Sequence, residues 1–228
     1  FNSICPETYT FYPAKREESE REEFILSSTS SIDFNDSNLE KKIWILKPSD
    51  GCKGHSIKIM DNPQEVLEFI DNQSDGSIAW VVQRYLENPI LIPQGNRKFD
   101  IRIWVLLDSS YQIHIYHQGV LRVTAKSYEP GNWTDLHSHL SNHCIAETHP
   151  DYGVYEPTNE IWFDEFELIL LEMSNGKISF ARDILPRIYN IIRLTLTSVR
   201  EKWECTSESS YRSFAVFGYD FMLTKRQT

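Results

Sequence analysis

Residues 97–107 read RKFDIRIWVLL, and this stretch decides the fold of the chain. Apolar and charged side chains alternate in it, which is typical of a β-strand with one buried face. The apolar side chains of Phe99, Ile101 and Ile103 project to one side and predict a core. The charged side chains of Lys98, Asp100 and Arg102 project to the other side, into water or into a polar cleft. Because most charged residues are exposed, spacing alone favours a solvated ladder of charges.

The rest of the chain alternates turn residues with short apolar runs, and the elements do not follow a strict strand–helix order. A turn at Gln118–Gly119 separates two of the expected strands, as in an antiparallel meander. This mixture predicts an α+β fold with a boundary near residues 93–96, which gives domains 1–94 and 95–228. Strands are expected over 43–47, 56–59, 80–86, 99–107, 112–117, 120–124 and 213–223, and helices over 62–71, 160–172 and 182–202, with a charged helix near 14–24 before a polar loop.

Charge and hydropathy exclude several classes of protein. The 228 residues carry 23 Lys and Arg against 33 Asp and Glu, a net charge of −10. Nucleic acids and anionic membranes attract basic proteins, so neither is an expected partner. No apolar run approaches the roughly 20 residues that span a bilayer. The 4 cysteines are widely spaced, which predicts free thiols and a cytoplasmic protein.

Against this acidic background, residues 97–126 form a cationic strip. Five Lys and Arg residues stand there against two Asp residues, a local charge of +3. Arginine binds phosphate and carboxylate groups through two parallel hydrogen bonds. The strip therefore predicts a site for a polyphosphate or a carboxylate.

Two further features are weaker signals. Lys47 ends an apolar strand and precedes the loop SDGCKGHS, whose glycines suit a phosphate cradle or an ordinary hairpin turn. Asp220 lies in the apolar run FAVFGYDFML, and a carboxylate there needs an arginine partner or Mg²⁺. The histidines at 137, 139, 143 and 149 beside Cys144 match no standard zinc signature, so a polar loop is the favoured interpretation.

Several segments in order resemble the tubulin-tyrosine ligase family, within the ATP-grasp superfamily. They are WILKPSDGCKGHSI, VVQRYLENPILI, GNRKFDIRIWVLL, YHQGVLR, HLSNHCI, NEIWFDEF and FGYDFML. The resemblance implies an ATP-grasp fold, with ATP held between two subdomains of mainly antiparallel sheets. Within the family, CPETYTFYP and HLSNHCI favour the tyrosine-adding branch over the polyglutamylase and polyglycylase branches.

The resemblance also implies roles for individual residues. ATP and Mg²⁺ are the implied cofactors. Lys47 and Lys53 would contact the phosphates, and Asp220 would bind Mg²⁺. Arg102 and Arg122 would orient the γ-phosphate and the acceptor carboxylate. The remaining nucleotide contacts would come from an adenine hinge and from the second subdomain: Gln83, Arg84, Tyr85, Leu86, Lys98, Asp100, Ser141 and Asn142.

The implied reaction joins free tyrosine to the C-terminal carboxylate of detyrosinated α-tubulin through an acyl phosphate, with the tubulin tail or dimer as partner, in the cytoplasm and on microtubules. A polyglutamylase and a non-catalytic nucleotide- or tubulin-binding form are the alternatives. Two departures from the family pattern stand out. Ser56 replaces a glycine in the phosphate loop, and the chain ends LTKRQT where the family continues with L-I-E-V-N. We therefore expect a fragment, incomplete at both ends, that lacks a small N-terminal domain and the metal-ligand strand.

Overall fold

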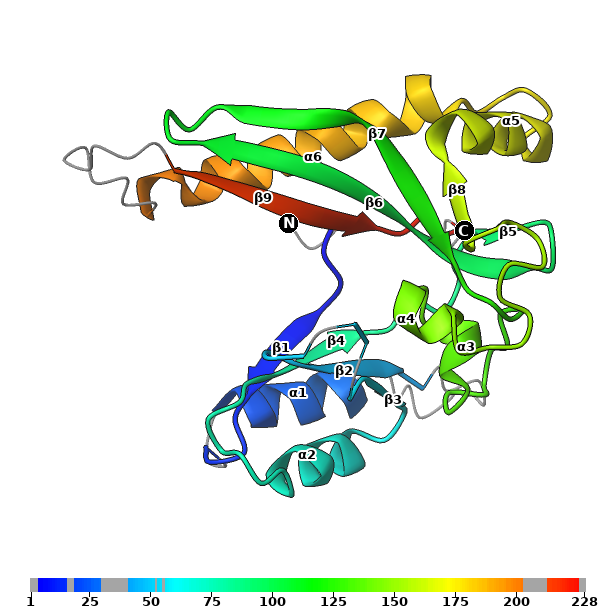
Figure 1. Ribbon diagram of the computed structural model, residues 1–228. Helices are drawn as coiled ribbons and strands as arrows, with labels where there is room; N and C mark the ends of the chain where they lie inside the picture. The colour runs from blue at the N-terminus through cyan, green and yellow to red at the C-terminus, as the bar shows by residue number, and fades with distance from the viewer. Residues whose placement is uncertain are drawn as a thin grey trace. The chain divides into compact units, whose positions relative to one another are not determined.

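The computed structural model describes residues 4–15, 19–29, 41–51, 53–54, 56–202 and 213–225. The chain forms two compact units, Phe1–Asn88 with Glu129–Leu136, and Pro89–Tyr128 with His137–Thr228. The division after Asn88 lies a few residues before the one expected from the sequence. All the described strand pairs are antiparallel and helices accompany both sheets, which confirms the α+β class (Figure 1).

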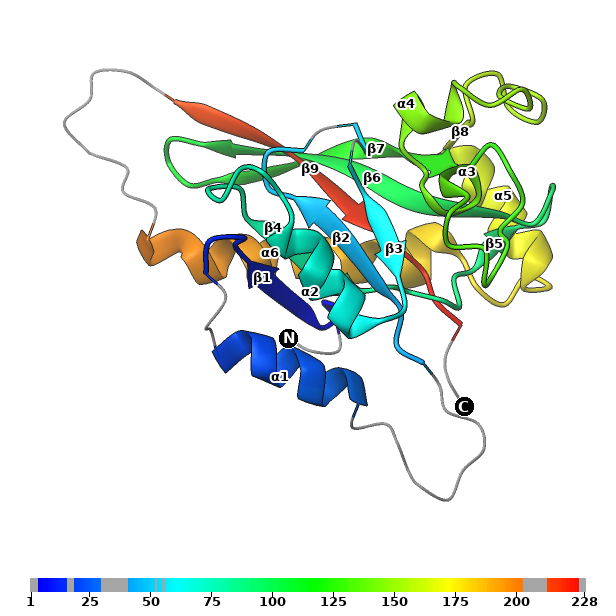
Figure 2. The same ribbon diagram turned by 90° about the horizontal axis from the view of Figure 1, so that it is seen from below.

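The first unit is a four-stranded sheet with two helices on one side (Figures 1 and 2). Its strand order is β1-β4-β2-β3. The core is aromatic: Phe24 of α1 meets Trp44 of β2 edge to face, with ring centroids 4.9 Å apart. Asn62 caps α2 by accepting hydrogen bonds from two backbone N–H groups of the first turn, as its place before Pro63 predicts. The elements are β1 (Thr8–Phe11), α1 (Ser19–Thr29), β2 (Trp44–Pro48), β3 (Lys58–Met60), α2 (Pro63–Asp71) and β4 (Trp80–Arg84).

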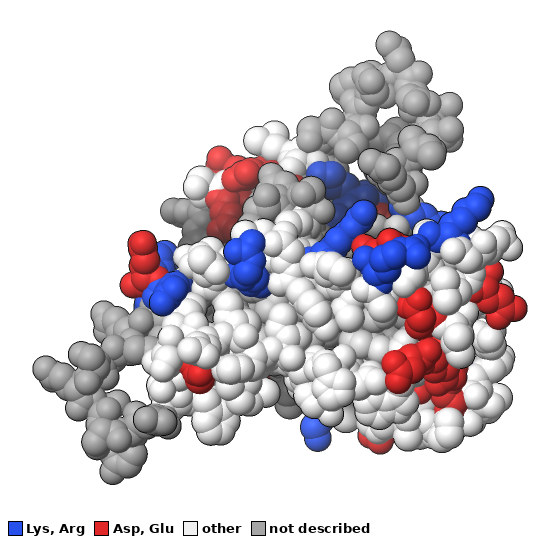
Figure 3. Space-filling view, turned by 90° about the horizontal axis from the view of Figure 1, so that it is seen from above, with Lys and Arg blue, Asp and Glu red and all other residues white. Residues whose placement is uncertain are grey.

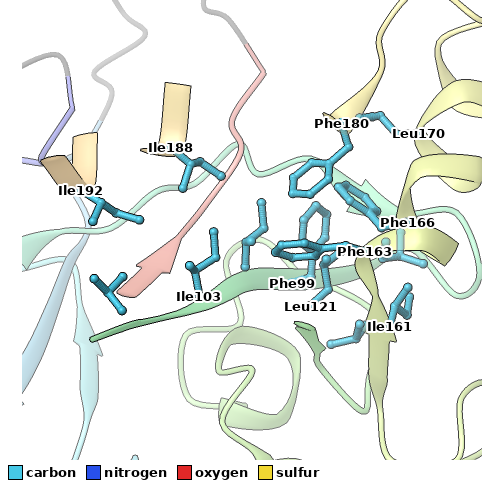
Figure 4. Close-up of a cluster of buried hydrophobic side chains, with 14 of the residues drawn as sticks. Phe99, Ile103, Leu121, Ile161, Phe163, Phe166, Leu170, Phe180, Ile188 and Ile192 are labelled. Carbon is cyan, nitrogen blue, oxygen red and sulfur yellow. The ribbon is translucent and has the colours of Figure 1, made fainter. Parts of the chain in front are cut away.

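The second unit is built around β6 (Arg97–Asp108), the stretch quoted above. β7 pairs with one edge of β6 and β9 with the other. The apolar face of β6 packs against α5 and α6, where Phe99, Phe166 and Ile192 are among the buried side chains (Figure 4). The remaining elements are β5 (Leu91–Ile92), β7 (Ile113–Val123), α3 (Leu136–His139), α4 (His143–Ala146), β8 (Glu160–Trp162), α5 (Phe163–Met173), η1 (Phe180–Ile184), α6 (Leu185–Val199), η2 (Arg200–Lys202) and β9 (Phe214–Phe221).

The turn expected at Gln118–Gly119 is wrong, because β7 runs unbroken through both residues. Gly119 lies opposite Ile103, where the register of the β6–β7 ladder shifts. A Cβ atom on Gly119 would stand 2.3 Å from the ring of Phe163. The glycine therefore allows α5 to pack closely on the strand, a role that looks the same as a turn in the sequence.

The expected helix bounds also change. Glu160–Trp162 pairs with β7 as a short strand before α5 begins. The helix expected over 182–202 begins instead as the π-helical turn η1, and α6 follows with Pro186 in its first turn. The charged helix begins at Ser19 and reaches Thr29, further along the chain than expected. The polar loop that follows it lies mostly outside the described residues.

Candidate functional site

The charged face of β6 is not a solvated ladder. Lys98 and Asp100 are only 5% and 7% exposed. The ammonium group of Lys98 donates a hydrogen bond of 2.9 Å to the carbonyl oxygen of His139, the last residue of α3. The charge ladder favoured on spacing alone is therefore wrong at these two positions, because the segment after β7 folds back and covers them.

Two arginines and two aspartates meet on this face, and we call Asp100, Arg102, Arg122 and Asp220 the Arg–Asp cluster. Strand register creates it, since Asp100 pairs with Arg122 on β7 and Arg102 pairs with Asp220 on β9. Two consecutive strands, β6 and β7, and the distant strand β9 thereby bring four charged side chains to one face of the sheet.

The hydrogen bonds of the cluster are shared unevenly. Arg102 is bidentate on Asp220, with Nε 2.5 Å from Oδ1 and Nη2 3.0 Å from Oδ2. Arg122 divides its donors: Nη2 lies 2.8 Å from Asp100 Oδ1 and 2.9 Å from Asp220 Oδ2. The hydroxyl of Ser141 also donates to Asp100. Asp220 thus has arginine partners, one of the two alternatives that the sequence left open, but its side chain is 47% exposed and does not need them to offset burial.

Burial and ion pairing shift the pKa values of these groups, and the shifts favour the neutral form of Asp100 and the charged form of Arg102. Burial raises the pKa of Asp100, while the neighbouring Arg122 acts against this shift. The hydrogen bond to Asp220 raises the pKa of Arg102, so this guanidinium stays charged. Two carboxylates balance two guanidinium groups, and Lys98 beside them leaves one net positive charge. A phosphate or carboxylate that enters would compete with the aspartates for these guanidinium groups.

Arg97, which the sequence counted within the same strip, belongs to a different structure. Its guanidinium forms two bonds with Glu156, of 2.9 and 2.5 Å. It also lies 4.2 Å from the ring centroid of Tyr155. The cationic strip therefore separates into a closed ion pair and an open cluster.

The predicted residues of the first unit lie on β2, on β4 and in the loops that follow them. The ammonium group of Lys47 donates to Gln83 Oε1 at 3.3 Å, so these two residues are neighbours. Arg84 pairs with Glu87 at 3.0 Å. The buried ring of Tyr85 packs edge to face on Trp133, and Leu86 follows it, half buried.

The loop after Lys47 has an unusual backbone. Lys53 is exposed with φ 58°, and Gly54 follows with φ 83°. Ser56 has φ 61°, in the left-handed region that glycine occupies most easily. The expected glycine position thus retains a glycine-like conformation with a serine in it.

The carboxylates of the cluster fit one kind of magnesium site. Proteins often hold Mg²⁺ with one or two carboxylates, completed by water and substrate phosphates. Asp100 and Asp220 could supply those two carboxylates, because both reach Nη2 of Arg122. In the described part of the chain, no group of three or more His, Cys, Asp and Glu side chains could hold a metal alone. A metal here would therefore depend on phosphates for its remaining ligands.

The histidine-rich segment is not the polar loop expected from the sequence, because it contains the short helices α3 and α4, and His139 is buried. His137 bonds to Thr148 Oγ1 at 3.0 Å, and its ring lies 5.0 Å from that of His149. Cys144 and Cys5 are free thiols, whereas Cys52 and Cys205 lie outside the described residues. Asn142 precedes α4, next to Ser141 of the cluster.

Sequence reasoning missed a shallow depression beside Arg122 that is open to solvent. Glu160, Thr158 and His143 line it together with Ser141. The signal was present in NEIWFDEF, but that segment was read as the start of a helix, which hides the pairing of Glu160 with β7.

Charge on the surface is mixed in sign. On the face shown in Figure 3, groups of Lys and Arg side chains and groups of Asp and Glu side chains lie among wide uncharged areas. A net charge of −10 therefore does not make this face uniformly acidic. Within the described residues, no helix has the length and apolar character needed to cross a membrane.

Comparison with known proteins gives a consistent picture. The model of the tubulin-tyrosine ligase family matches residues 4–227. Tubulin glycylase 3D of Tetrahymena thermophila is 34% identical over 81% of this chain and 17% of its own length. A probable tubulin polyglutamylase of Caenorhabditis elegans is 36% identical over 79% of this chain and 42% of its own length. A tubulin polyglutamylase of Xenopus tropicalis is 28% identical over 82% of this chain and 21% of its own length. The chain thus spans less than half the length of each of these relatives.

Proposed function

Because this chain belongs to the tubulin-tyrosine ligase family, we propose that it is the nucleotide-binding part of an ATP-dependent ligase that joins an amino acid to a carboxylate of tubulin. The Arg–Asp cluster is the observation that carries this proposal. It presents two guanidinium groups on one sheet face, where they can bind phosphate and carboxylate together.

In the proposed reaction, an acceptor carboxylate attacks the γ-phosphorus of ATP, ADP leaves, and an acyl phosphate forms. The amine of the amino acid then attacks the acyl carbon, phosphate leaves, and the amine loses a proton. Reactions of this type depend on positioning and charge neutralisation more than on a covalent group of the enzyme.

The residues of this chain would divide the positioning between them. Arg102 and Arg122 would orient the γ-phosphate and the acceptor carboxylate. Lys98 is held by the carbonyl of His139, so its charge is fixed beside the cluster, where it would attract the phosphates. Asp100 would also contact the nucleotide. Ser141 and Asn142 would complete the contacts on this side.

In the first unit, Lys47 and Lys53 would contact phosphates, and the backbone of Gln83, Arg84, Tyr85 and Leu86 would bind adenine. Asp220, with Asp100 close by, would hold Mg²⁺, which would neutralise phosphate charge. Because Asp220 is bonded to both arginines, its release would free Arg102 for an anion.

The identity of the added amino acid changes from our sequence expectation. The relatives described above are named glycylases and polyglutamylases, and these names do not support free tyrosine as the substrate. We therefore propose glycine or glutamate in its place. The free thiols of Cys5 and Cys144 support a reducing compartment, and we propose the cytoplasm, where microtubules lie.

Incorporation of labelled amino acids into tubulin tests the proposal. Purified protein, ATP and Mg²⁺ are incubated with tubulin and with labelled glycine, glutamate or tyrosine in separate reactions. We expect ATP-dependent incorporation of glycine or glutamate. Incorporation of tyrosine alone would restore the first expectation. ATP binding without any incorporation would favour the non-catalytic alternative.

A further inference from the structure

The outer face of α6 carries basic side chains that the site described above does not use. Residues 185–202 contain four basic residues and one acidic residue, Glu201. The basic residues are exposed, and they are Arg187, Arg193, Arg200 and Lys202. We call Arg187, Arg193 and Arg200 the α6 arginines. The whole chain has a net charge of −10, so this face is opposite in sign to the protein as a whole.

The position of α6 separates these arginines from the Arg–Asp cluster. Ile188 and Ile192 lie on the side of α6 that faces the sheet and are buried in the core (Figure 4). This core packs against the apolar face of β6, whereas the cluster lies on the opposite face of the same strand. Ligands of the cluster therefore cannot reach the α6 arginines.

The α6 arginines also differ from the arginines of the sheet in their partners. Arg97, Arg102 and Arg122 are each bonded to a carboxylate. Among the described residues, none of the α6 arginines forms an ion pair. Arg193 donates a hydrogen bond of 2.9 Å to the amide oxygen of Asn190, and Arg200 lies 5.3 Å from the ring centroid of Tyr111. Both contacts orient a guanidinium group without neutralising it.

Arg187 has an acidic neighbour that is already bonded. Two hydrogen bonds from Arg182 to Asp183, of 3.0 and 2.8 Å, and one of 2.8 Å from the backbone N–H of Ser179 hold that carboxylate. With Arg182 as the main cause, they lower the pKa of Asp183 to about 2, and the charge of Arg187 adds a smaller effect. Within the described residues, the guanidinium of Arg187 forms no hydrogen bond of its own, so its donors remain for a ligand.

The spacing of the α6 arginines suits an extended chain of acidic residues. At about 1.5 Å per helical residue, they recur along the axis every 9 to 10 Å or so. An extended peptide advances about 3.3 Å per residue, so roughly every third side chain would meet an arginine. Leu194, 45% exposed, lies among them and adds an apolar contact. Arginine beside exposed apolar side chains is typical of protein–protein interfaces.

Other polyanions fit this face less well. Sites for single-stranded nucleic acid stack bases on aromatic rings, and none of the exposed residues in 185–202 is aromatic. A helix that binds an anionic membrane inserts its apolar side, whereas the apolar side of α6 is buried in the core. We propose that the α6 arginines form a docking surface for an acidic polypeptide. The surface is additional to the ligase site and does not depend on its activity.

Fluorescence anisotropy with a labelled oligoglutamate peptide tests the surface, in the absence of ATP. The peptide should bind at low salt and weaken about tenfold near 0.15 M salt, where exposed charges are screened. An oligothymidylate of the same length should bind more weakly. Tighter binding of the oligothymidylate, or no binding of the peptide at low salt, would overturn the assignment.

Variants locate the peptide on α6. Changing all three α6 arginines to glutamine should weaken binding about tenfold, the combined effect of three exposed ion pairs. Glutamine and arginine have similar helix propensities, so the helix should persist. The matched control changes the exposed Lys41, Lys58 and Lys225 to glutamine. It removes the same charge, and an equal loss in this control would show that only net charge matters.

Two single variants complete the test. Glu201→Gln removes the acidic residue of this face and should strengthen peptide binding about twofold, a gain that misfolding cannot produce. Arg102→Gln should leave peptide binding unchanged, and a large loss there would place the peptide on the Arg–Asp cluster instead. Because neither ATP nor an amino acid is present, failure of the ligase proposal would leave this surface, and failure of the surface would leave the ligase.

Discussion

Two arginine structures on the same strand show how burial separates support from binding. Arg97 is 1% exposed, and Glu156 takes both ends of its guanidinium. Its Nε donates to the carbonyl of Gln94 at 2.9 Å. The Arg–Asp cluster is more open, with Arg102 26% and Asp220 47% exposed.

The difference lies in whether a partner can be exchanged. Every edge of the Arg97 guanidinium is bonded or stacked, so its charge is satisfied and no ligand can reach it. In the cluster, Arg122 divides its donors between two carboxylates, and water reaches Asp220. Exchange of one anion for another costs little where the partners are shared and solvated. The closed pair therefore holds the loop around Glu156 on β6, and the open cluster is available for anions.

Removal of Arg97 should give the largest effect and tests the closed side of the comparison. Arg97→Ala leaves Glu156 as a buried carboxylate without its partner, which costs about 3–5 kcal/mol of unfolding free energy. Urea denaturation followed by circular dichroism measures this loss. The double variant Arg97→Met with Glu156→Leu removes both charges and should recover most of it. A loss below 1 kcal/mol for Arg97→Ala would show that the pair does not support the fold.

Removal of Arg122 tests the open side. Arg122→Ala should lower ligation by about 10²–10³-fold, the usual cost of one electrostatic contact to a transition state. The affinity for ATP should remain nearly unchanged, because we assign Arg122 to the acceptor carboxylate. ATP titration and labelled amino-acid incorporation measure the two quantities separately. An equal loss of ATP affinity would contradict that assignment.

Substitution of Gly218 should have a smaller effect on ligation, because it would act by displacing Arg102. A Cβ atom at Gly218 would stand 3.2 Å from Cζ, Nε and Nη1 of the Arg102 guanidinium. Gly218→Ala should therefore displace the guanidinium from Asp220 and lower ligation by about tenfold, or roughly 1.4 kcal/mol.

A double-mutant cycle separates this positioning effect from a general change in the sheet. In the Arg102→Ala background, Gly218→Ala should cost no further activity, because the group it displaces is already gone. A full tenfold loss in both backgrounds would show that Gly218 acts independently of Arg102.

The sequence predicted the buried face of β6 and the positive charge of residues 97–126. It did not predict that these charges divide into a closed ion pair and an open cluster. Alternation in RKFDIRIWVLL is local, so the buried face of β6 could be predicted from Phe99 and Ile101 alone. The partners of the charges are not local: Asp220 and Glu156 lie far from β6 in sequence. Their pairing depends on strand register and on a loop that folds back, and neither leaves a periodic signal. Counting charge along residues 97–126 therefore joined two structures that are separate in space.

Gly119 and Glu160 show a second reason why some predictions from the sequence were wrong. A glycine between two apolar runs predicts a turn, yet at position 119 it makes room for Phe163. Likewise, when a short strand continues directly into a helix, the sequence pattern predicts a single helix. The pairing of Glu160 with β7 could therefore not be predicted. Local patterns identify the kind of element, but close packing decides where it begins.

A network in the first unit tests whether partial exposure alone marks a binding site. The hydroxyls of Tyr9 and Ser27 and the ammonium group of Lys42 all donate to the Glu7 carboxylate, at 2.7, 2.7 and 3.0 Å. Both carboxylate oxygens are thus bonded to groups of the chain, although Glu7 is 34% exposed. By the reasoning above, this closed network should contribute to stability. Tyr9→Phe should then cost about 1 kcal/mol of unfolding free energy at pH 7.

The pH dependence of that cost shows whether the network is closed. Burial, with the charge of Glu7, raises the pKa of Tyr9 to about 12, against about 10 in an unfolded chain. A raised pKa means that the folded state holds its proton more tightly, so this contribution is complete below pH 10 and is lost as the pH rises toward 12. The difference in unfolding free energy between wild type and Tyr9→Phe should therefore narrow between pH 9 and pH 11.5 in urea titrations. Tyr116→Phe, at an exposed position of β7, is the matched control. If the unfolding free energies of wild type and Tyr9→Phe change with pH in parallel, water reaches the phenol of Tyr9. A complete set of internal hydrogen bonds would then not distinguish a supporting network from a binding site.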